Sequence, residues 1–406
     1  MSESGDEIER ATGHRFRVVR ALVRDRSRSR SFAVDDGLLT SDFEEIRDDP
    51  SIALVAEVMG GIEPTADYVL QLLRAGKPVV SANKQLIARR GAEIFAAASE
   101  QGVQLRFEAS VCAAIPVIKV LRESLVVTNV HRLLGIVNGT TNFILTRMEA
   151  GADYGEALAE AQRLGYAEAD PADDVSGADA AAKMAILATV AFGARVTLDD
   201  VLCEGIDQMR HEHIAAAHEL GMAVRLVGTA ALLPAGFDVR VQPALVDRHH
   251  PLASVEGAFN AVMLQGDAIR EITLAGPGAG GPETASAIVA DMVSVVGTAG
   301  TGFLQNDACW RTLPRAPAGD LRSQFYVHVE VDDRPGVLAQ LAERLAAHGV
   351  SVARLAQRQL AAGAALDIVT HDAASGRVDD ALAAITDLDV VRRPPDRFRV
   401  IAERGV

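Results

Sequence analysis

The sequence is poor in aromatic residues, which make up only 4% of its 406 residues. Proteins that bind single-stranded nucleic acid stack bases on aromatic side chains, so this scarcity argues against such a platform. The formal net charge of −15 argues the same way, because phosphate contacts require a basic face. We therefore expect no nucleic-acid partner, and cores built mainly from Ala, Val, Leu and Ile.

Cysteine and long apolar runs are also scarce. Cys112, Cys203 and Cys309 form no CxxC pair and lie in no motif typical of a nucleophile, which argues against a disulfide framework or a structural zinc site. The most apolar stretch, 184–196, is interrupted by Arg195 and is shorter than the about 20 residues that span a bilayer. The first thirty residues contain no secretory signal. We expect a soluble protein of the reducing cytoplasm.

The first part of the chain alternates between strand and helix patterns, and its length suggests two or three domains. We predict strands over 17–23, 52–58, 78–81 and 103–107, with helices over 64–75 and 84–101. Strands and helices alternating at this spacing indicate an α/β fold with a parallel, doubly wound, Rossmann-like sheet.

The rest of the chain has a different organisation. An α+β block is expected from strands over 130–137, 224–232, 237–243 and 259–274 and helices over 140–150, 153–164 and 173–192. A Gly-rich turn at 275–286 leads into a long helix, and a Pro- and Gly-containing linker follows at 312–320. The last eighty residues have the order βαββαβ, with strands over 324–331, 350–358, 365–371 and 396–402, which is typical of a ferredoxin-like module.

One group of charged residues stands out. Five acids precede one lysine as a helix begins: Glu168, Asp170, Asp173, Asp174, Asp179 and then Lys183. Asp179 and Lys183 are four residues apart and share a helix face. This pair is either a solvated surface ion pair or a functional lysine. The apolar run that follows Lys183 favours the second interpretation, because burial moves the pKa of an ammonium towards values useful in acid–base catalysis.

Other motifs lie where predicted strands end or helices begin. They are Glu57-Val-Met-Gly-Gly, Ser81-Ala-Asn-Lys and Gly276-Pro-Gly-Ala-Gly-Gly. Ligands bind at the carboxyl edge of open parallel sheets, and the amides that open a helix can meet an anion. Each motif is also what an ordinary tight turn would contain.

Together with Gly135-Ile-Val-Asn-Gly-Thr-Thr-Asn-Phe-Ile and the Gly165-Tyr-Ala-Glu-Ala-Asp-Pro run, these motifs resemble homoserine dehydrogenase over about residues 15–310. From Tyr326 the chain is similar to an ACT domain, of which the turn Asp333 to Leu338 is typical. The resemblance implies NAD(P)-dependent interconversion of L-aspartate 4-semialdehyde and L-homoserine, on the route to threonine, methionine and isoleucine.

The resemblance also implies roles for individual residues. Lys183 is expected to donate the proton and Lys84 to lie near the nicotinamide. The substrate residues are Glu168, Asp174, Asp179, Tyr166, Gly139 and Thr140. The cofactor residues are Met59, Ser81, Ala82, Lys84, Gly278, Gly280 and Arg24. A monovalent cation such as Na⁺ would be held by backbone carbonyls of Glu108, Val111, Ala113 and Ile115, where the family often has glycines. An amino-acid effector, with threonine as the first candidate, would bind near Asp333, Gly336, Val337 and Leu338.

The implied domains are a truncated NAD(P)-binding domain at 1–115 completed by about 275–312, a catalytic domain at 116–274, a linker at 313–323 and an ACT domain at 324–406. The first residues resemble the end of the helix that follows the family's G-x-G-x-x-G turn, so the first strand and that turn are expected to be absent. Since this strand is central in the usual order, we expect an unstable or rearranged dinucleotide-binding half and weak or absent cofactor binding.

Three alternatives stay open at this point. Arg24 to Arg30 form either a solvated loop or a phosphate-facing one. An acid such as Asp25 favours NAD and an arginine such as Arg24 favours NADP, and we expect NADP as the preferred form. The chain is either the enzyme or a non-catalytic, amino-acid-binding or scaffold protein. The ACT domain provides either feedback control or only oligomerisation, with a homodimer or homotetramer expected in both cases.

Overall fold

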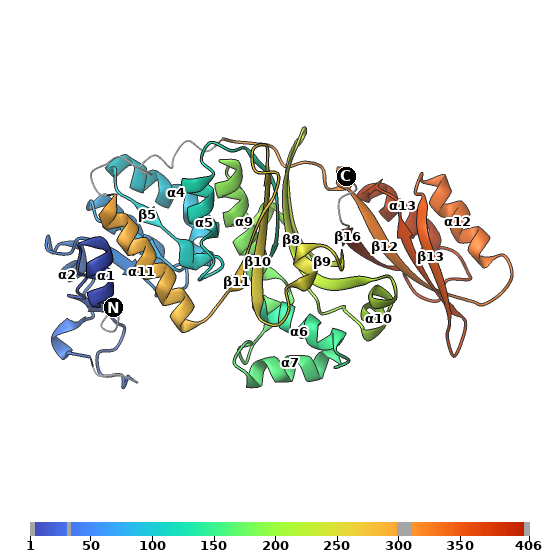
Figure 1. Cartoon of the computed structure of the whole chain (residues 1–406), viewed down its shortest axis with the longest axis horizontal. Helices are drawn as coiled ribbons and strands as arrows, with labels where there is room; N and C mark the ends of the chain where they lie inside the picture. The colour runs from blue at the N-terminus through green and yellow to red at the C-terminus, as the bar shows by residue number, and fades with distance from the viewer. Residues whose placement is uncertain (1–4, 31–33, 299–310, 402–406) are drawn as a thin grey trace. The chain divides into compact units, whose positions relative to one another are not determined.

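The computed structural model describes residues 5–30, 34–298 and 311–401. Cys309 and part of the 275–312 segment lie outside these residues. The chain divides into two compact units. Unit 1 contains residues 1–126, 189–197 and 279–312, and unit 2 contains residues 127–188, 198–278 and 313–406. Figure 1 shows the elements of both units.

Unit 1 contains parallel strands with helices between them, as the alternation predicts. The three-stranded sheet has the order β3 (Val55–Glu57), β4 (Val79–Ser81) and β5 (Leu105–Arg106). The strands β1 (Ala21–Leu22) and β2 (Leu39–Thr40) form a separate parallel pair. Helix α3 (Thr65–Arg74) connects β3 to β4, and α4 (Lys84–Gln101) connects β4 to β5. Helix α1 (Gly5–Thr12) precedes β1, and the one-turn α2 (Glu44–Arg47) lies between β2 and β3.

The long helix α11 (Gly281–Gly297) returns to unit 1 and packs on its sheet. Met292 and Val295 of α11 form an apolar cluster with Val80 of β4, and Leu54 and Phe16 pack against it. A short helical segment, α5 (Val117–Lys119) and the turn at Val120–Ser124, follows β5. The loops that connect β3 to α3 and β4 to α4 lie at the carboxyl ends of these strands.

Unit 2 is built on one large sheet of eleven strands. Its main path runs β11 (Ile272–Pro277), β10 (Phe259–Gly266), β6 (Val130–Ile136), β8 (Met222–Leu233), β9 (Gly236–Asp247), β16 (Asp396–Ile401), β12 (Arg322–Val331), β14 (Ala364–Thr370) and β13 (Val352–Gln359). The strand β7 (Val201–Cys203) pairs with β9, and β15 (Ala373–Ala374) pairs with β12. Most neighbours are antiparallel, which agrees with the predicted α+β block.

Several helices accompany these strands, and one of them packs on the sheet where a glycine removes a side chain. They are α6 (Gly139–Glu149), α7 (Tyr154–Arg163), α8 (Ala172–Val175), α9 (Ala178–Phe192) and α10 (His211–Glu219). Met184 of α9 lies so close to Gly228 of β8 that a Cβ there would be 2.4 Å from the methionine Cγ. A glycine in a strand interior weakens the strand, and here the close approach of the helix accounts for it.

The C-terminal module has the βαββαβ order that the sequence predicts. Helices α12 (Val337–Ala347) and α13 (Ser375–Thr386) cover one face of its strands, and Phe325, Leu341, Ile368 and Ile385 belong to its apolar core. Its last strand, β16, pairs in parallel with β9, with Arg399 opposite Ala244. The module therefore continues the sheet of the preceding residues.

Three predicted elements differ from the structure. The helix expected over 173–192 is two helices, α8 and α9, because Gly177 between them has a φ of +84°, which is incompatible with a right-handed helix. The strand expected over 259–274 is the hairpin of β10 and β11. The strand expected over 17–23 has only two paired residues, and α10 was missed.

No helix in the described part of the chain is long and apolar enough to span a membrane. The most apolar predicted stretch forms the second half of α9 and the turn after it.

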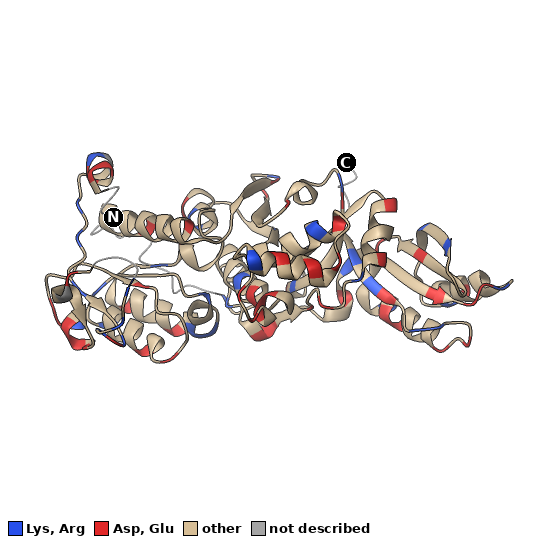
Figure 2. Ribbon diagram, turned by 90° about the horizontal axis from the view of Figure 1, so that it is seen from below, with Lys and Arg blue, Asp and Glu red and all other residues tan. Residues whose placement is uncertain are grey.

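Charged residues lie along strands as well as helices (Figure 2). Arg399 of β16 is a buried one with few partners. It is 6% exposed, its Nη1 donates to Thr229 Oγ1 at 3.3 Å, and its Nε has no hydrogen-bond partner in the described structure. Burial, together with the nearby Arg132 and Arg240, lowers the pKa of Arg399 to about 10. Below that pH the guanidinium is charged in both the folded and the unfolded state, and burying the charge destabilises the folded state.

We predict that Arg399→Met raises the free energy of unfolding by about 1 kcal/mol at neutral pH, because an apolar chain of similar length replaces a poorly paired buried charge. Urea denaturation would measure it. Arg397→Met is the matched control on the same strand. It removes an ion pair to Asp379 and the contact over the Phe325 ring, and should not stabilise. A loss of stability in Arg399→Met would show that the guanidinium contributes more than it costs.

Candidate functional site

The carboxyl edge of the unit 1 sheet is organised by the side chain of Glu57, the last residue of β3. Glu57 is 5% exposed, and Ser81 Oγ at the end of β4 donates to its Oε2 at 2.5 Å. The backbone N–H groups of Met59 and Gly60 donate to its Oε1, at 2.7 and 3.3 Å. One buried carboxylate thus fixes the turn after β3 to the end of β4.

The turn itself requires its two glycines. Gly60 and Gly61 have φ of +71° and +69°, a region that residues with a Cβ rarely adopt. Asn83 Nδ2 donates to the Gly61 carbonyl at 2.6 Å, while Asn83 Oδ1 accepts from the backbone N–H of Leu86 and caps α4. The loops after β3 and β4 are therefore tied to each other as well as to Glu57.

The predicted cofactor residues of this edge lie around these contacts. Ser81 is buried, Ala82 is partly buried and Met59 is 40% exposed. Lys84 is the first residue of α4, directly after the Asn83 cap. Sequence reasoning assigned no role to Glu57. The signal that could have found it is an acid that ends a buried strand and precedes two glycines.

Unit 2 brings together a second group, on the loop after β6 and on α8 and α9. Lys183 Nζ lies 2.8 Å from Asp179 Oδ2 and donates to the Val137 carbonyl at 2.8 Å. Asn138 Nδ2 donates to Asp179 Oδ2 at 2.9 Å and to Asp174 Oδ1 at 2.7 Å. The sequence-predicted residues Lys183, Asp179 and Asp174 therefore form one polar cluster, joined by Asn138.

This lysine is buried and is not part of a solvated surface pair. Lys183 is 8% exposed and Asp179 is 6% exposed. The chain has only four lysines, Lys77, Lys84, Lys119 and Lys183. Burying an ammonium is costly unless it is paired and hydrogen-bonded, and both conditions are met here. The interpretation of Asp179–Lys183 as a solvated surface pair is therefore wrong, and a functional role of the lysine stays a prediction.

Asp174 has an environment that favours its neutral form. Burial raises its pKa, and the charge of Asp179 also raises it, whereas the hydrogen bond from Asn138 lowers it. The adjacent Thr140 Oγ1 donates to the Tyr166 carbonyl at 2.6 Å, and the Tyr166 ring lies against Phe143 with centroids 5.1 Å apart. The predicted residues Thr140 and Tyr166 thus lie beside the cluster.

Two other predicted substrate residues are placed differently. Gly139 opens α6, where a Cβ would be 2.6 Å from the Ala258 carbonyl oxygen, so its role in the fold is close packing. Glu168 is exposed in the turn between α7 and α8, and Gln162 donates to its backbone carbonyl at 3.2 Å. No described residue hydrogen-bonds to the Glu168 carboxylate.

The remaining predicted cofactor residues are separated along the chain. Arg24 is exposed just after β1 in unit 1. Gly278 belongs to unit 2, where a Cβ would overlap the Asn260 side chain. Gly280 belongs to unit 1 and caps the N-terminus of α11 with a φ of +139°.

The predicted cation residues Glu108, Val111, Ala113 and Ile115 form a buried loop after β5, and all four are 5% exposed or less. Ala113 has a φ of +43°, the left-handed region where glycine is favoured. The Glu108 carboxylate accepts from the backbone N–H groups of Ile118 and Lys119, both at 2.8 Å, and Asp291 of α11 accepts from the Glu108 N–H.

The predicted effector turn opens α12 of the C-terminal module. Gly336 caps α12 with a φ of +90°, Val337 is buried, and Asp333 and Leu338 are exposed. A left-handed residue at this position accounts for the glycine of the turn.

Comparisons with known proteins agree with this organisation. The homoserine dehydrogenase NAD-binding domain model matches residues 3–108, the homoserine dehydrogenase model residues 116–293, and the ACT domain model residues 325–390. A homoserine dehydrogenase of Synechocystis sp. is 41% identical over 94% of this chain and 91% of its own length.

Solved structures show the same likeness. A homoserine dehydrogenase from Thiobacillus denitrificans matches with a TM-score of 0.91 at 38% identity, over 99% of this chain and 94% of that chain. A hyperthermophilic archaeal homoserine dehydrogenase in complex with NADPH matches with a TM-score of 0.55 at 31% identity, over 63% of this chain and 75% of that chain.

We predict that Glu108 makes stability fall with rising pH. Burial raises its pKa from 4.5 to about 7, so the folded state holds a proton that the unfolded state releases. Stability should therefore fall between about pH 5 and about pH 8, by about 2–3 kcal/mol from this group. Urea denaturation at both values would measure the fall.

Glu108→Gln stays neutral throughout and should flatten this pH dependence, whereas Glu100→Gln, an exposed control on α4, should leave it unchanged. An equal fall in Glu108→Gln and in the unsubstituted protein would assign the effect to another group.

Proposed function

The chain belongs to the homoserine dehydrogenase family, and we propose that it interconverts L-aspartate 4-semialdehyde and L-homoserine with Lys183 as the residue that exchanges the proton. The observation that carries the proposal is the buried cluster of Lys183, Asp179, Asn138 and Asp174. Such a cluster presents one ammonium group in a largely apolar surrounding, and that group suits the developing alkoxide of a reduced aldehyde.

The nicotinamide cofactor, when bound, supplies or accepts the hydride. The chain's own residues fit it at the carboxyl edge of the unit 1 sheet, because the Gly60–Gly61 turn leaves open space where side chains would otherwise lie. Glu57, Ser81 and Asn83 would hold this turn, and Lys84 would stand beside the bound nicotinamide. The likeness to the archaeal enzyme solved with NADPH, and the exposed Arg24 after β1, support NADP as the preferred form.

The proton would move between the substrate oxygen and Lys183 Nζ. Asp179 and the Val137 carbonyl orient the ammonium and stabilise its charged form. Asn138 links the carboxylates of Asp174 and Asp179 by donating to both. Glu168 would bind the substrate's ammonium group, since its carboxylate is exposed and has no partner in the described structure, and Asp174 would support it from the cluster.

A monovalent cation fits the loop after β5. The backbone carbonyls of Glu108, Val111, Ala113 and Ile115 would hold it, and no described residue donates a backbone hydrogen bond to the carbonyls of Val111 and Ala113. The ion would fix the conformation of a loop whose left-handed residue is alanine.

The ACT domain would place the activity under feedback control by an amino acid, with threonine as the first candidate. The exposed Asp333 at the opening of α12 suits an ammonium group, and the backbone amides that begin the helix suit a carboxylate. A homodimer or homotetramer is expected with it.

We predict that Lys183→Met lowers kcat for homoserine oxidation by about 10²–10⁴-fold, because the group that exchanges the proton is lost. The assay follows homoserine-dependent reduction of NADP by nicotinamide absorbance. Lys119→Met is the control, since Lys119 donates to Ser294 at the α5–α11 contact. A melting curve and circular dichroism spectrum like those of the unsubstituted protein would show that Lys183→Met is folded, and near-normal turnover by that folded variant would refute the proposed role.

We predict that Asp333→Ala raises the threonine concentration for half-maximal inhibition without changing the uninhibited rate. Glu343→Ala, exposed on α12, is the matched control and should leave inhibition unchanged. If threonine does not inhibit the unsubstituted protein, other amino acids of the pathway would be tested in the same assay. Equal inhibition of both variants would place the effector elsewhere.

A further inference from the structure

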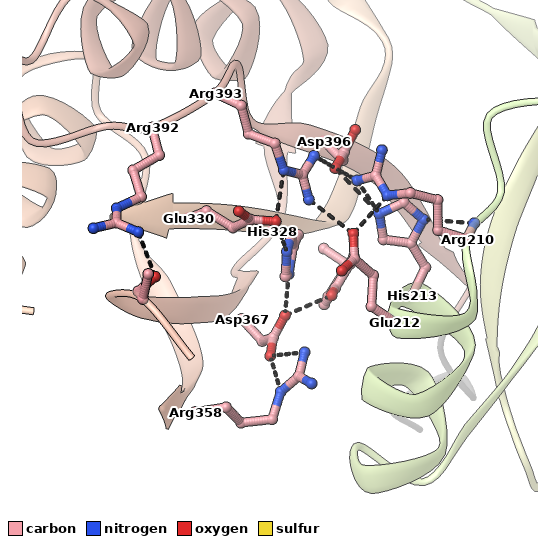
Figure 3. A network of polar contacts seen from close by, with 12 residues as sticks. Arg210, Glu212, His213, His328, Glu330, Arg358, Asp367, Arg392, Arg393 and Asp396 are labelled. Carbon is pink, nitrogen blue, oxygen red and sulfur yellow. Dashed lines mark hydrogen bonds and ion pairs between the residues drawn. The ribbon is translucent and has the colours of Figure 1, made fainter. Parts of the chain in front are cut away.

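A polar network lies where α10 meets the strands of the C-terminal module (Figure 3). One side of the network is the start of α10, with Arg210, Glu212 and His213. The other side is formed by the C-terminal module, with His328 and Glu330 of β12, Asp367 of β14, Arg393 just before β16, and Asp396 at the start of β16. None of these residues belongs to the active site proposed above. The network contains two buried histidines among several carboxylates.

The protonation of His328 follows from its contacts. Its Nδ1 lies 2.7 Å from Asp367 Oδ1. The Asp367 carboxylate also accepts from Tyr326 Oη at 2.6 Å and from Arg358 Nε at 2.9 Å. Asp367 is therefore an acceptor, so Nδ1 of His328 carries the proton. In the neutral ring Nε2 then has a free lone pair.

That lone pair points to no hydrogen-bond donor. His328 is 1% exposed, and its Nε2 has no hydrogen-bond partner in the described structure. The nearby carboxylate oxygen Glu330 Oε1 is 3.8 Å away, too far for a hydrogen bond. Ligand atoms of Glu212, His328 and Glu330 all lie within 4.8 Å of one another. One imidazole nitrogen and two carboxylates thus converge without a donor for the nitrogen.

The second histidine does not offer the same lone pair. His213 Nδ1 accepts from the Arg210 backbone N–H at 3.3 Å, and its Nε2 lies 2.9 Å from Arg210 Nη2 and 3.1 Å from Asp396 Oδ2. Glu212, His213 and Asp396 also lie close together, but both nitrogens of His213 already have partners. The nitrogen without a partner in His328 separates the two groups.

We propose that Glu212, His328 and Glu330 form a binding site for a divalent transition-metal ion of the zinc class, in which the ion competes with the guanidinium of Arg393. A histidine nitrogen, two carboxylates and a water molecule together make a ligand set typical of zinc. The Asp367–His328 hydrogen bond is the outer-shell contact that orients a ligating imidazole.

Arg393 now neutralises these carboxylates. It donates to Glu330 Oε1 at 2.6 Å, to Glu212 Oε1 at 2.9 Å and to Asp396 Oδ2 at 2.6 Å. Its side chain is 26% exposed, so it can turn to solvent and keep Asp396 as a partner. The bound ion would then join α10 directly to β12 and replace two ion pairs by coordination bonds.

The test is zinc binding by the full 406-residue chain, free of affinity tags and stripped with a chelator, measured by isothermal titration. Cobalt(II) absorption would report nitrogen and oxygen ligands. The expected result is one ion per chain. His328→Gln and Glu330→Gln should each weaken binding by about 10–100-fold or more. Arg393→Met should strengthen it, because the competing cation is removed.

His213→Gln is the matched control and should leave the affinity unchanged. Melting curves would confirm that each variant is folded. If His328→Gln does not fold, Glu330→Gln still tests the proposal, because Glu330 is partly exposed. Zinc binding by His328→Gln and Glu330→Gln that is as tight as that of the unsubstituted chain would assign the ion to surface histidines and overturn the proposal. No binding by either the unsubstituted chain or Arg393→Met would overturn the proposal, and neither result depends on dehydrogenase activity.

Discussion

The buried ammonium of Lys183 is the constraint on which the second unit depends. An unpaired charge in that position would cost several kcal/mol, so the surrounding elements have to supply partners. Asp179 does so from the same helix, and the Val137 carbonyl does so from the end of β6. Asn138 then links the Asp179 and Asp174 carboxylates and also caps α6 through the Thr141 N–H. The residues that hold the lysine therefore also start α6 and position α8 and α9, so local structure and site chemistry cannot be varied independently.

The first unit uses a buried carboxylate in the same way. Glu57 accepts from two backbone amides and from Ser81, and so adds a side-chain link to two strand ends that are already paired through their backbones. Glycine alone would make the Gly60–Gly61 turn possible but not fixed, because it adds conformational freedom. The carboxylate removes that freedom, and Asn83 fixes the turn from the other side. A preorganised loop loses less entropy when it binds a ligand than a mobile one does.

Much of the fold and of the Lys183 cluster could be predicted from sequence, because their signals are local. Alternating strand and helix patterns predicted β3, β4, β5 and the helices between them, and the spacing of four residues predicted the Asp179–Lys183 pair. Features that depend on a single residue, or on contacts between residues far apart in the sequence, were missed. The break at Gly177 depends on a single backbone angle, and Glu57 acts through residues up to 24 positions away. The His328 network joins residues more than a hundred positions apart, and no periodicity indicates such contacts.

The junction of the C-terminal module combines a short strand pairing with many charged contacts. Only Arg399, Val400 and Ile401 of β16 are paired with β9, whereas Arg210 and Arg393 bind carboxylates on both sides of the junction. Ion pairs of partly exposed groups contribute little each, and their sum depends on which cations are present. Such a junction has alternative arrangements close in free energy, because one cation can replace another without exposing apolar core. Allosteric coupling usually amounts to about 1–3 kcal/mol, which is the scale of one or two such contacts. A ligand that changes the partners of one arginine is therefore sufficient, in free energy, to alter how the module is held against α10.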